Sequence, residues 1–402
     1  MTPNRLIGPL GLPVRPDRAR PDQTFISKEG FQYMRRLSTL LSLFALGVMV
    51  VVGMLLLSSR RTQAQGLGGN AEQQAAQAKL EESYPKLQAN IQFMKLAIPG
   101  QTMGQTTGVA TNSKGHMFVY SRSVNQGLAR GGKAAMLWEF DENGKFVKEW
   151  GPNNYAESFA HAVRVDKADN VWQVDEGSGM VVEYNPEGQH IFWLGRTPEA
   201  VDYLQANLEA LHFAPANPPM PRPPHPTGRM GSFDRETDVA FDSQNNIFVS
   251  DGYGNSRVVK ISPDGHWLKA VGTWGHDQDN FSTPHGITID AQNNVYVADR
   301  GNRRIQVYDD DLNFKKTIAG VGAPWSLCTT NTTPQVLFTG DGTTGKIFKM
   351  DMSGKVLGMF VTGQDHGEEN TGDLVHALDC RSPNTVYIGS ATMWDVQKVT
   401  IK

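Results

Sequence analysis

The hydrophobic and polar positions of residues 237–308 repeat one pattern twice. In each copy, apolar and polar residues alternate, break at an Asn-rich turn and alternate again, with the turns at 243–246 and 291–294. Alternation with a period of two is typical of β-strands that bury one face. Each copy therefore predicts a small antiparallel sheet, and this sheet recurs along the chain.

The pattern occurs six times when the chain is aligned on the end of the first strand of each copy. One equivalent position in these strands holds Thr107, His161, Thr237, His285, Trp325 and His376. Most copies have three further strands, and a Gly-containing turn joins the last two. Repeated units of four short strands predict an all-β fold, a six-bladed β-propeller over residues 105–402. Two β-sandwiches, the alternative, fit the even repeat less well.

The N-terminal part of the chain lacks this pattern. Residues 1–36 are rich in Pro and Arg and predict a disordered cytoplasmic tail. Residues 37–57 are almost wholly apolar. At about 1.5 Å per residue they can cross a bilayer core of roughly 30 Å as a transmembrane helix. The excess of Lys and Arg before them predicts a propeller outside the cytoplasm, periplasmic or extracellular. A translation start at Met34 would instead make this segment a cleaved signal sequence of a secreted protein.

Two irregular segments complete the domain organisation. Residues 58–104 are expected to be a stalk or linker with a loosely helical pattern, interrupted at Pro85. Residues 196–236 form an insertion between the second and third units, where seven prolines within 215–226 exclude regular structure. Because insertions of this length are usually functional or mobile, we hypothesise that it covers one end of the channel.

Charge and cysteine content narrow the function classes. The net charge is −3 and charged residues are mixed throughout, so no nucleic-acid partner is expected. Cys328 and Cys380 are the only cysteines. Each lies in an apolar strand, and the sequence leaves open whether they form a disulfide or two buried thiols.

Histidines recur at the equivalent position of every second unit. His161, His285 and His376 occupy it, and the first strand of each propeller blade lines the central channel. A lone histidine there would most simply pack or accept a hydrogen bond. Three in the same phase converge with approximate threefold symmetry, which suits a tetrahedral Zn²⁺ whose fourth position is left for water or substrate. The pattern therefore predicts a metal site.

Three further residues follow second strands, whose ends surround the channel mouth. They are Tyr253, Arg122 and Arg300. A phenol acts as acid or base when a nearby cation lowers its pKa, and a guanidinium can bind a carboxylate through two hydrogen bonds. Each residue alone would be read as turn packing or surface charge. Together with the histidines they are candidate catalytic residues.

The repeats resemble NHL repeats, and the propeller resembles the catalytic domain of peptidyl-α-hydroxyglycine α-amidating lyase. The most specific stretches are residues 250–259, 283–286 and 297–300. This resemblance implies a lyase that cleaves the C–N bond of an N-(α-hydroxy) amide and releases an amide and glyoxylate. It also implies a zinc cofactor and a small-molecule or peptide substrate.

The resemblance assigns roles to the candidate residues. It implies zinc binding by the three histidines, catalysis by Tyr253, and substrate binding by Arg122 and Arg300. It further implies a structural calcium bound by the carbonyls of Val109 and Val163 and by an aspartate. Ala377 stands at the position of that aspartate, which argues against calcium.

Two other functions are compatible with the pattern. A non-catalytic, membrane-tethered NHL propeller would bind a protein or a glycan, since fold alone does not fix function. A different zinc hydrolase would need a carboxylate base near the metal, and no Glu occurs at the equivalent position.

Overall fold

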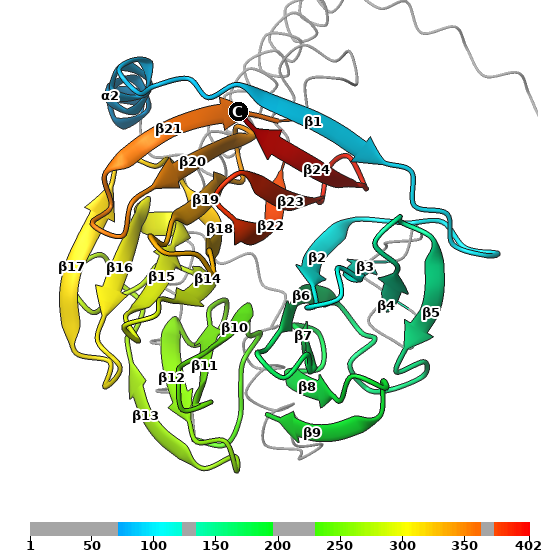
Figure 1. Cartoon of the computed structure of the whole chain (residues 1–402). Coiled ribbons are helices and arrows are strands. Elements are labelled where there is room, and N and C mark those ends of the chain that lie inside the picture. Colours follow the sequence, from blue (N-terminus) through cyan, green and yellow to red (C-terminus); the bar gives the residue numbers. More distant parts are fainter. Residues whose placement is uncertain (1–70, 123–133, 196–229, 363–373) are drawn as a thin grey trace, which may run out of the picture. The chain divides into compact units, whose positions relative to one another are not determined.

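A computed structural model describes residues 71–122, 134–195, 230–362 and 374–402. These residues form six four-stranded antiparallel sheets arranged around a common centre (Figure 1). The predicted six-bladed β-propeller is therefore confirmed. The strands of the first three blades are β2 (Thr106–Thr111), β3 (Met117–Arg122), β4 (Ala135–Phe140) and β5 (Phe146–Trp150); β6 (Ala160–Val165), β7 (Val171–Asp175), β8 (Met180–Tyr184) and β9 (His190–Leu194); β10 (Asp238–Phe241), β11 (Ile247–Asp251), β12 (Arg257–Ile261) and β13 (Trp267–Val271).

The other three blades have the same order from the centre outward. Their strands are β14 (Pro284–Ile289), β15 (Val295–Asp299), β16 (Arg304–Tyr308) and β17 (Phe314–Ala319); β18 (Pro324–Thr329), β19 (Leu337–Asp341), β20 (Lys346–Met350) and β21 (Val356–Val361); β22 (Val375–Ser382), β23 (Thr385–Ser390), β24 (Val396–Ile401) and β1 (Ala89–Met94). A short 3₁₀ helix, η1 (Arg300–Asn302), follows β15, and the helix α2 (Ala71–Glu82) precedes β1.

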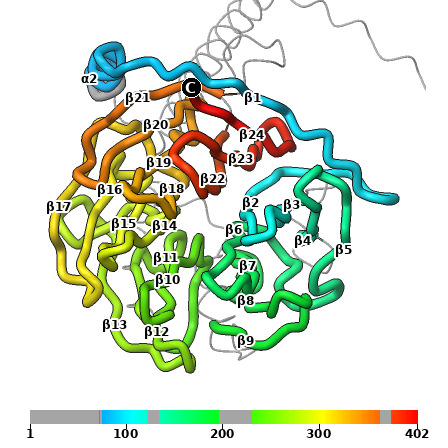
Figure 2. Tube along the Cα trace, in the orientation of Figure 1, coloured from blue at the N-terminus to red at the C-terminus, as the bar shows by residue number. Residues whose placement is uncertain are grey.

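The sixth blade takes its outermost strand from the N-terminal side of the chain. β1 pairs antiparallel with β24, from Ala89 opposite Ile401 to Met94 opposite Val396. Figure 2 shows the two strands side by side, β1 in blue and β24 in red. These residues lie within 58–104, the expected linker. The strand was not expected because its alternation is weak and its partner is distant in sequence.

Several expectations fall outside the described residues. They are the tail at 1–36, the apolar segment at 37–57 and most of the insertion at 196–236. Within the parts of the chain that the structure describes, no helix has both the length and the apolar character needed to cross a membrane.

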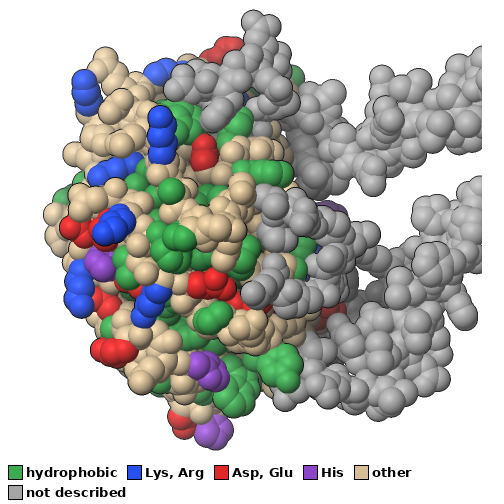
Figure 3. All heavy atoms as spheres, turned by 90° about the vertical axis from the view of Figure 1, so that its right-hand side faces the viewer, with side chains coloured by type: hydrophobic (Ala, Val, Ile, Leu, Met, Phe, Trp, Pro, Cys, Tyr) green, Lys and Arg blue, Asp and Glu red, His purple; other side chains and the backbone are tan. Residues whose placement is uncertain are grey.

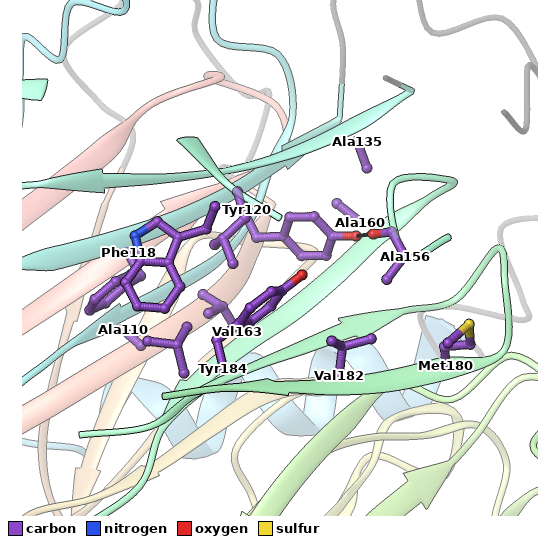
Figure 4. Close-up of a cluster of buried hydrophobic side chains, with 13 residues drawn as sticks. Ala110, Phe118, Tyr120, Ala135, Ala156, Ala160, Val163, Met180, Val182 and Tyr184 are labelled. Atoms are coloured by element: carbon purple, nitrogen blue, oxygen red, sulfur yellow. Dashed lines mark hydrogen bonds between the residues drawn. The ribbon is translucent and has the colours of Figure 1, made fainter. Parts of the chain in front are cut away.

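Apolar side chains fill the spaces between neighbouring blades. The cluster in Figure 4 joins blade 1 to blade 2, where Phe118 and Tyr120 of β3 pack with Val163, Val182 and Tyr184. The Tyr120 hydroxyl also donates a hydrogen bond to the buried Asp175 carboxylate, 2.6 Å away. Inner strands are buried on both faces, whereas the outer strand β9 is mostly exposed. The core therefore lies close to the channel and holds its lining strands rigidly.

The side of the propeller in Figure 3 carries Lys and Arg interspersed with Asp and Glu. Neither sign of charge gathers on this face.

A disulfide joins Cys328 of β18 to Cys380 of β22 and so links blades 5 and 6. The cysteines are 52 positions apart, and closing a loop of this length restricts the unfolded chain. Replacing both with alanine is expected to lower the free energy of unfolding by about 2–4 kcal/mol, measured by urea denaturation. The oxidised protein treated with a thiol reductant should match the double variant. Equal stability of the variant and the oxidised protein would contradict this prediction.

Glu183 on β8 makes the free energy of unfolding depend on pH. Burial, with the nearby Asp166 charge, raises the pKa of Glu183 to about 7 from 4.5. Between these values the unfolded chain has lost a proton that the folded chain keeps, so stability falls as pH rises from 4.5 to 7. We expect Glu183→Gln to raise the free energy of unfolding at pH 8 by about 1 kcal/mol, because partial exposure reduces the effect, and to change it little at pH 4.5. Urea denaturation at both pH values tests this, with Glu187→Gln as control; equal gains at both would contradict it.

Candidate metal centre

Each of the three histidines lies at an irregularity of an inner strand. On β6, Ala160 and Ala162 pair with consecutive residues of β7, which leaves His161 without a partner. On β22, the residues on either side of His376 likewise pair with consecutive residues of β23. On β14, the register shifts between Pro284 and Ile287, the segment that contains His285. A bulge of this kind turns a side chain out of the regular alternation. Here it places all three imidazoles in the channel lining.

The imidazoles converge and are oriented by the backbone. One ligand nitrogen from each ring lies within 4.8 Å of the others, and all three rings are buried. Nδ1 of His161 donates to the Thr237 carbonyl, that of His285 to Trp325 (2.7 Å) and that of His376 to Thr107 (2.9 Å). Because a carbonyl only accepts, each Nδ1 carries the proton and each Nε2 keeps a lone pair. Three Nε2 lone pairs are therefore available to one ion.

The surroundings keep the imidazoles uncharged. Burial lowers the pKa of His376 to about 3, with further lowering by the Arg122 charge. Burial likewise holds the pKa values of His161 and His285 well below 6.5, and the neighbouring imidazoles add to the effect. A metal ion binds only the neutral form of imidazole. The three rings are thus in the ligand state at neutral pH.

Tyr253 reaches two of these rings from the loop after β11. Its hydroxyl oxygen is 3.4 Å from Nε2 of His161 and 3.2 Å from Nε2 of His285, and it accepts a hydrogen bond from Nη1 of Arg300 at 3.3 Å. The Arg235 guanidinium lies 4.6 Å from the centre of the Tyr253 ring. A phenol in contact with two ligand nitrogens and a cation is well placed to move a proton beside the ion.

Two features fix the loops that carry Tyr253 and Arg300. The buried Asp251 and Asp299, at the ends of β11 and β15, each accept a backbone N–H from the loop before the inner strand, at 2.9 and 2.8 Å. Gly252 is also required, because a Cβ there would collide with the Pro284 carbonyl on β14. The close approach of these two segments sets the reach of Tyr253.

Arg300 is a buried cation without a described counter-ion. No carboxylate of the described residues lies within ion-pair distance of its guanidinium, and its Nε is buried without a hydrogen-bond partner among them. It stacks on Trp325, with 4.2 Å from the guanidinium carbon to the ring centre. Burying an unpaired charge is unfavourable. The arrangement therefore favours binding of an anionic ligand.

Arg122 is close to the site but is more fully engaged. Nε donates to the Ala160 carbonyl at 3.0 Å, Nη1 donates to Gln105 at 2.9 Å, and Nη2 lies 3.9 Å from the Glu176 carboxylate. Glu176 also forms an ion pair with Arg235 at 2.9 Å. The structure thus brings Arg300 to Tyr253 directly, whereas Arg122 acts on the site mainly through its charge.

Three residues of the site were not assigned a role from sequence. Glu176 and Arg235 lie in loops, where the repeat gives no phase. Trp325 does occupy the imidazole position of its blade, and its ring centre is 4.8 Å from that of His285. The shared position was the signal that could have identified Trp325 as a wall of the site.

The donor set fits zinc. Three neutral imidazoles with one position left open are typical of catalytic zinc sites. This is also the one cluster of His, Cys, Asp and Glu with suitable spacing among the residues that the structure describes. His161, His285 and His376 would hold the ion.

The residues do not fit the implied calcium. A narrow cavity of about 10 Å³ lies below the imidazoles and is lined by Val163, Ala377, Arg164 and Asp238, among others. Val109 is buried on β2. Calcium takes six to eight oxygen ligands, usually with carboxylates among them. Ala377 supplies no carboxylate, and both oxygens of Asp238 accept hydrogen bonds from Arg164.

Comparison with known proteins shows which families this chain resembles. Residues 281–308 match the NHL repeat family model. The chain is 39% identical to NHL repeat-containing protein 3 of Homo sapiens over 113 residues, which cover 27% of this chain and 31% of that protein. It is 26% identical over 333 residues to peptidylglycine alpha-amidating monooxygenase of Rattus norvegicus, covering 74% of this chain and 30% of that protein. Each match spans less than two thirds of the relative.

A second amidating relative and the solved structures agree with the fold. A probable peptidyl-alpha-hydroxyglycine alpha-amidating lyase of Caenorhabditis elegans is 26% identical over 238 residues, covering 56% of this chain and 61% of that protein. A protein of unknown function from Bacteroides thetaiotaomicron has a TM-score of 0.53 at 13% identity, covering 79% of this chain and 77% of that one. At such identity a structural match shows the fold alone. The chain is thus a six-bladed β-propeller that matches the NHL repeat model at residues 281–308 and resembles the peptidyl-α-hydroxyglycine α-amidating lyases.

Proposed function

We propose that the protein is a zinc-dependent lyase that cleaves the C–N bond of an N-(α-hydroxy) amide such as a peptidyl-α-hydroxyglycine. The products are an amide and glyoxylate. The observation that carries this proposal is the convergence of three neutral imidazoles, with the Tyr253 hydroxyl in contact with two of them. The distant amidating relatives support it. Bound zinc would supply a Lewis acid that polarises the substrate hydroxyl.

The reaction requires one proton to move between two substrate atoms. As the hydroxyl O–H bond breaks, a C=O bond forms, and the C–N bond breaks with its electron pair going to nitrogen, which then takes up a proton. The Tyr253 phenol would give its proton to the departing nitrogen and take up the proton that the substrate hydroxyl releases, so that it ends the reaction neutral. The Arg300 guanidinium, 3.3 Å away, would stabilise the negative charge on the phenol oxygen during the transfer.

Arg300 would also bind the substrate carboxylate. Its guanidinium is buried, lacks a carboxylate partner among the described residues and has a free Nε donor there. A planar carboxylate can accept two parallel hydrogen bonds from such a group. Trp325 would hold the guanidinium in place by stacking beneath it.

The test compares two substrates that differ only at this carboxylate. Zinc-loaded protein is assayed with N-acetyl-α-hydroxyglycine and with the corresponding α-hydroxyglycinamide. Glyoxylate release from the acid should exceed the spontaneous rate, and Arg300→Met should lower kcat/KM for the acid by about 10–100-fold. The amide should lose less activity than the acid, because both substrates lose the charge beside Tyr253 and only the acid also loses its carboxylate contact. Protein that holds one zinc per chain but does not accelerate glyoxylate release would overturn the proposal.

A non-catalytic binding platform is the second candidate. The 39% identity to NHL repeat-containing protein 3 over 113 residues supports it, since that relative is named for its repeats. A zinc-free chain would support this function. The Cys328–Cys380 disulfide supports either function in an oxidising compartment outside the cytoplasm.

A further inference from the structure

Arg164 of β6 crosses the channel one layer below the imidazoles. Its Nε donates to Oδ1 of Asp238 at 2.8 Å, Nη1 donates to the Leu378 carbonyl at 2.9 Å and Nη2 to the Leu327 carbonyl at 3.3 Å. Asp238 also accepts the backbone N–H of Ile287 at 3.1 Å. One side chain of blade 2 therefore contacts blades 3, 5 and 6 directly, and reaches blade 4 through Asp238.

Every one of these contacts lies near a residue of the imidazole layer. Pairs on the same strand are His161 and Arg164 on β6, His285 and Ile287 on β14, Trp325 and Leu327 on β18, and His376 and Leu378 on β22. Members of a pair are two or three residues apart, which is at most about 10 Å along a strand. The strands that Arg164 and Asp238 join are thus the strands that carry the three imidazoles.

The neighbouring positions leave room for this long side chain. The residues equivalent to Arg164 in the other blades are small or short: Ala110, Ala240, Thr288, Cys328 and Asp379. All of them line a cavity of about 150 Å³ together with Arg164. At this position of the repeat no other blade has a large cation, although Arg381 of blade 6 lines the same cavity.

The guanidinium remains charged in this position. Burial alone would lower the pKa of Arg164, but the Asp238 charge raises it above its ordinary value. A divalent cation in the adjacent cavity would meet this fixed positive charge and would find Asp238 already bound on both oxygens. The other carboxylate of the cavity, Asp379, already accepts a hydrogen bond from the Thr111 hydroxyl at 2.5 Å.

We propose that the Arg164 guanidinium takes the structural place of a channel cation and holds the histidine-bearing strands in register without calcium. The lack of fit for calcium described above follows from this substitution. The consequence for zinc affinity rests on the proposed zinc site, whereas the independence from calcium does not.

The first measurement uses the unaltered protein in calcium-free buffer. Its calcium content by mass spectrometry should be far below one ion per chain, and 1 mM calcium chloride should leave its melting temperature unchanged. Bound calcium near one ion per chain, or a clear rise in melting temperature, would overturn the proposal. This result is independent of whether the protein binds zinc or turns over a substrate.

The second measurement tests the link to zinc. Arg164→Met should raise the zinc dissociation constant by at least about 10-fold in competition with a chromogenic chelator, as expected for a group that orients metal ligands. Lys260→Met, which breaks a buried ion pair with Asp310 away from the channel, is the matched control and should leave zinc affinity unchanged. Wild-type zinc affinity in folded Arg164→Met would contradict the strand-holding role.

A third variant addresses loss of folding in Arg164→Met. The double variant Arg164→Met with Ala377→Asp restores a carboxylate and removes the guanidinium, so it should gain a melting temperature that rises with added calcium. If calcium stabilises the unaltered protein equally, the guanidinium does not replace the ion.

Discussion

Replacing His285 with alanine is expected to remove zinc from the protein and leave the propeller folded. Structural zinc sites with four ligands bind with about 10–16 kcal/mol, so one ligand contributes about 3 kcal/mol. Its loss should weaken zinc binding by more than about 100-fold, and lyase activity should be lost with the ion. Metal content is measured by mass spectrometry on the purified protein, and folding by circular dichroism.

The fold should tolerate this change. His285 makes one backbone hydrogen bond, to Trp325, and leaving that carbonyl unpaired costs about 1–3 kcal/mol. His266→Ala is the control, since this side chain is 78% exposed and lies in a turn of blade 3. Retention of one zinc per chain by His285→Ala would place the ion elsewhere. A wild-type chain without metal, even after zinc is supplied, would leave the binding platform as the better account.

Replacing Tyr253 with phenylalanine should abolish turnover and leave zinc bound. The ring keeps its packing, and only the hydroxyl that contacts His161, His285 and Arg300 is lost. General acid or base catalysis contributes about 10²–10⁴-fold, so kcat should fall within that range. KM should change little, because the proposed carboxylate contact belongs to Arg300.

The control for this change is another tyrosine on a loop. Tyr155→Phe alters a side chain that is 70% exposed and should leave kcat unchanged. Zinc content and kcat are measured on the same samples. If Tyr253→Phe loses its zinc, Tyr253 supports the metal and is not the proton carrier. If it keeps both zinc and kcat, another group carries the proton.

The propeller and the histidine layer could be predicted from the sequence because both follow from the repeated pattern of residues. His161, His285 and His376 share one phase, and the structure brings them within 4.8 Å. Tyr253 and Arg300 were found in the same way, because second strands end at equivalent places. The bulges that turn the imidazoles into the channel left no separate signal.

Other features of the fold and the site could not be predicted, because they depend on contacts between residues that are distant in sequence. β1 was not distinguished from a linker, because its few alternating residues become a strand only against β24. Glu176 lies in a loop, and its two arginine partners come from other blades. Arg164 differs from the residues at the equivalent positions, which are all small or short, and this difference was the one indication of its role. Its hydrogen-bond acceptors are the backbone carbonyls of Leu327 and Leu378, which any residue type would supply. The state of Cys328 and Cys380 required knowing that β18 and β22 are neighbours.

The pairing of β1 with β24, which completes the sixth blade and closes the ring of blades, is expected to occur late in synthesis and folding. Residues about three hundred positions apart must meet before the sixth blade gains its fourth strand, and a ribosome makes β24 long after β1. That blade also carries His376. Until β22 packs between β18 and β2, the third imidazole has no fixed place, so an incomplete nascent chain would present at most two ligands to the proposed zinc. At the proposed zinc site, retention of the metal would therefore report that blade 6 has assembled against its neighbours.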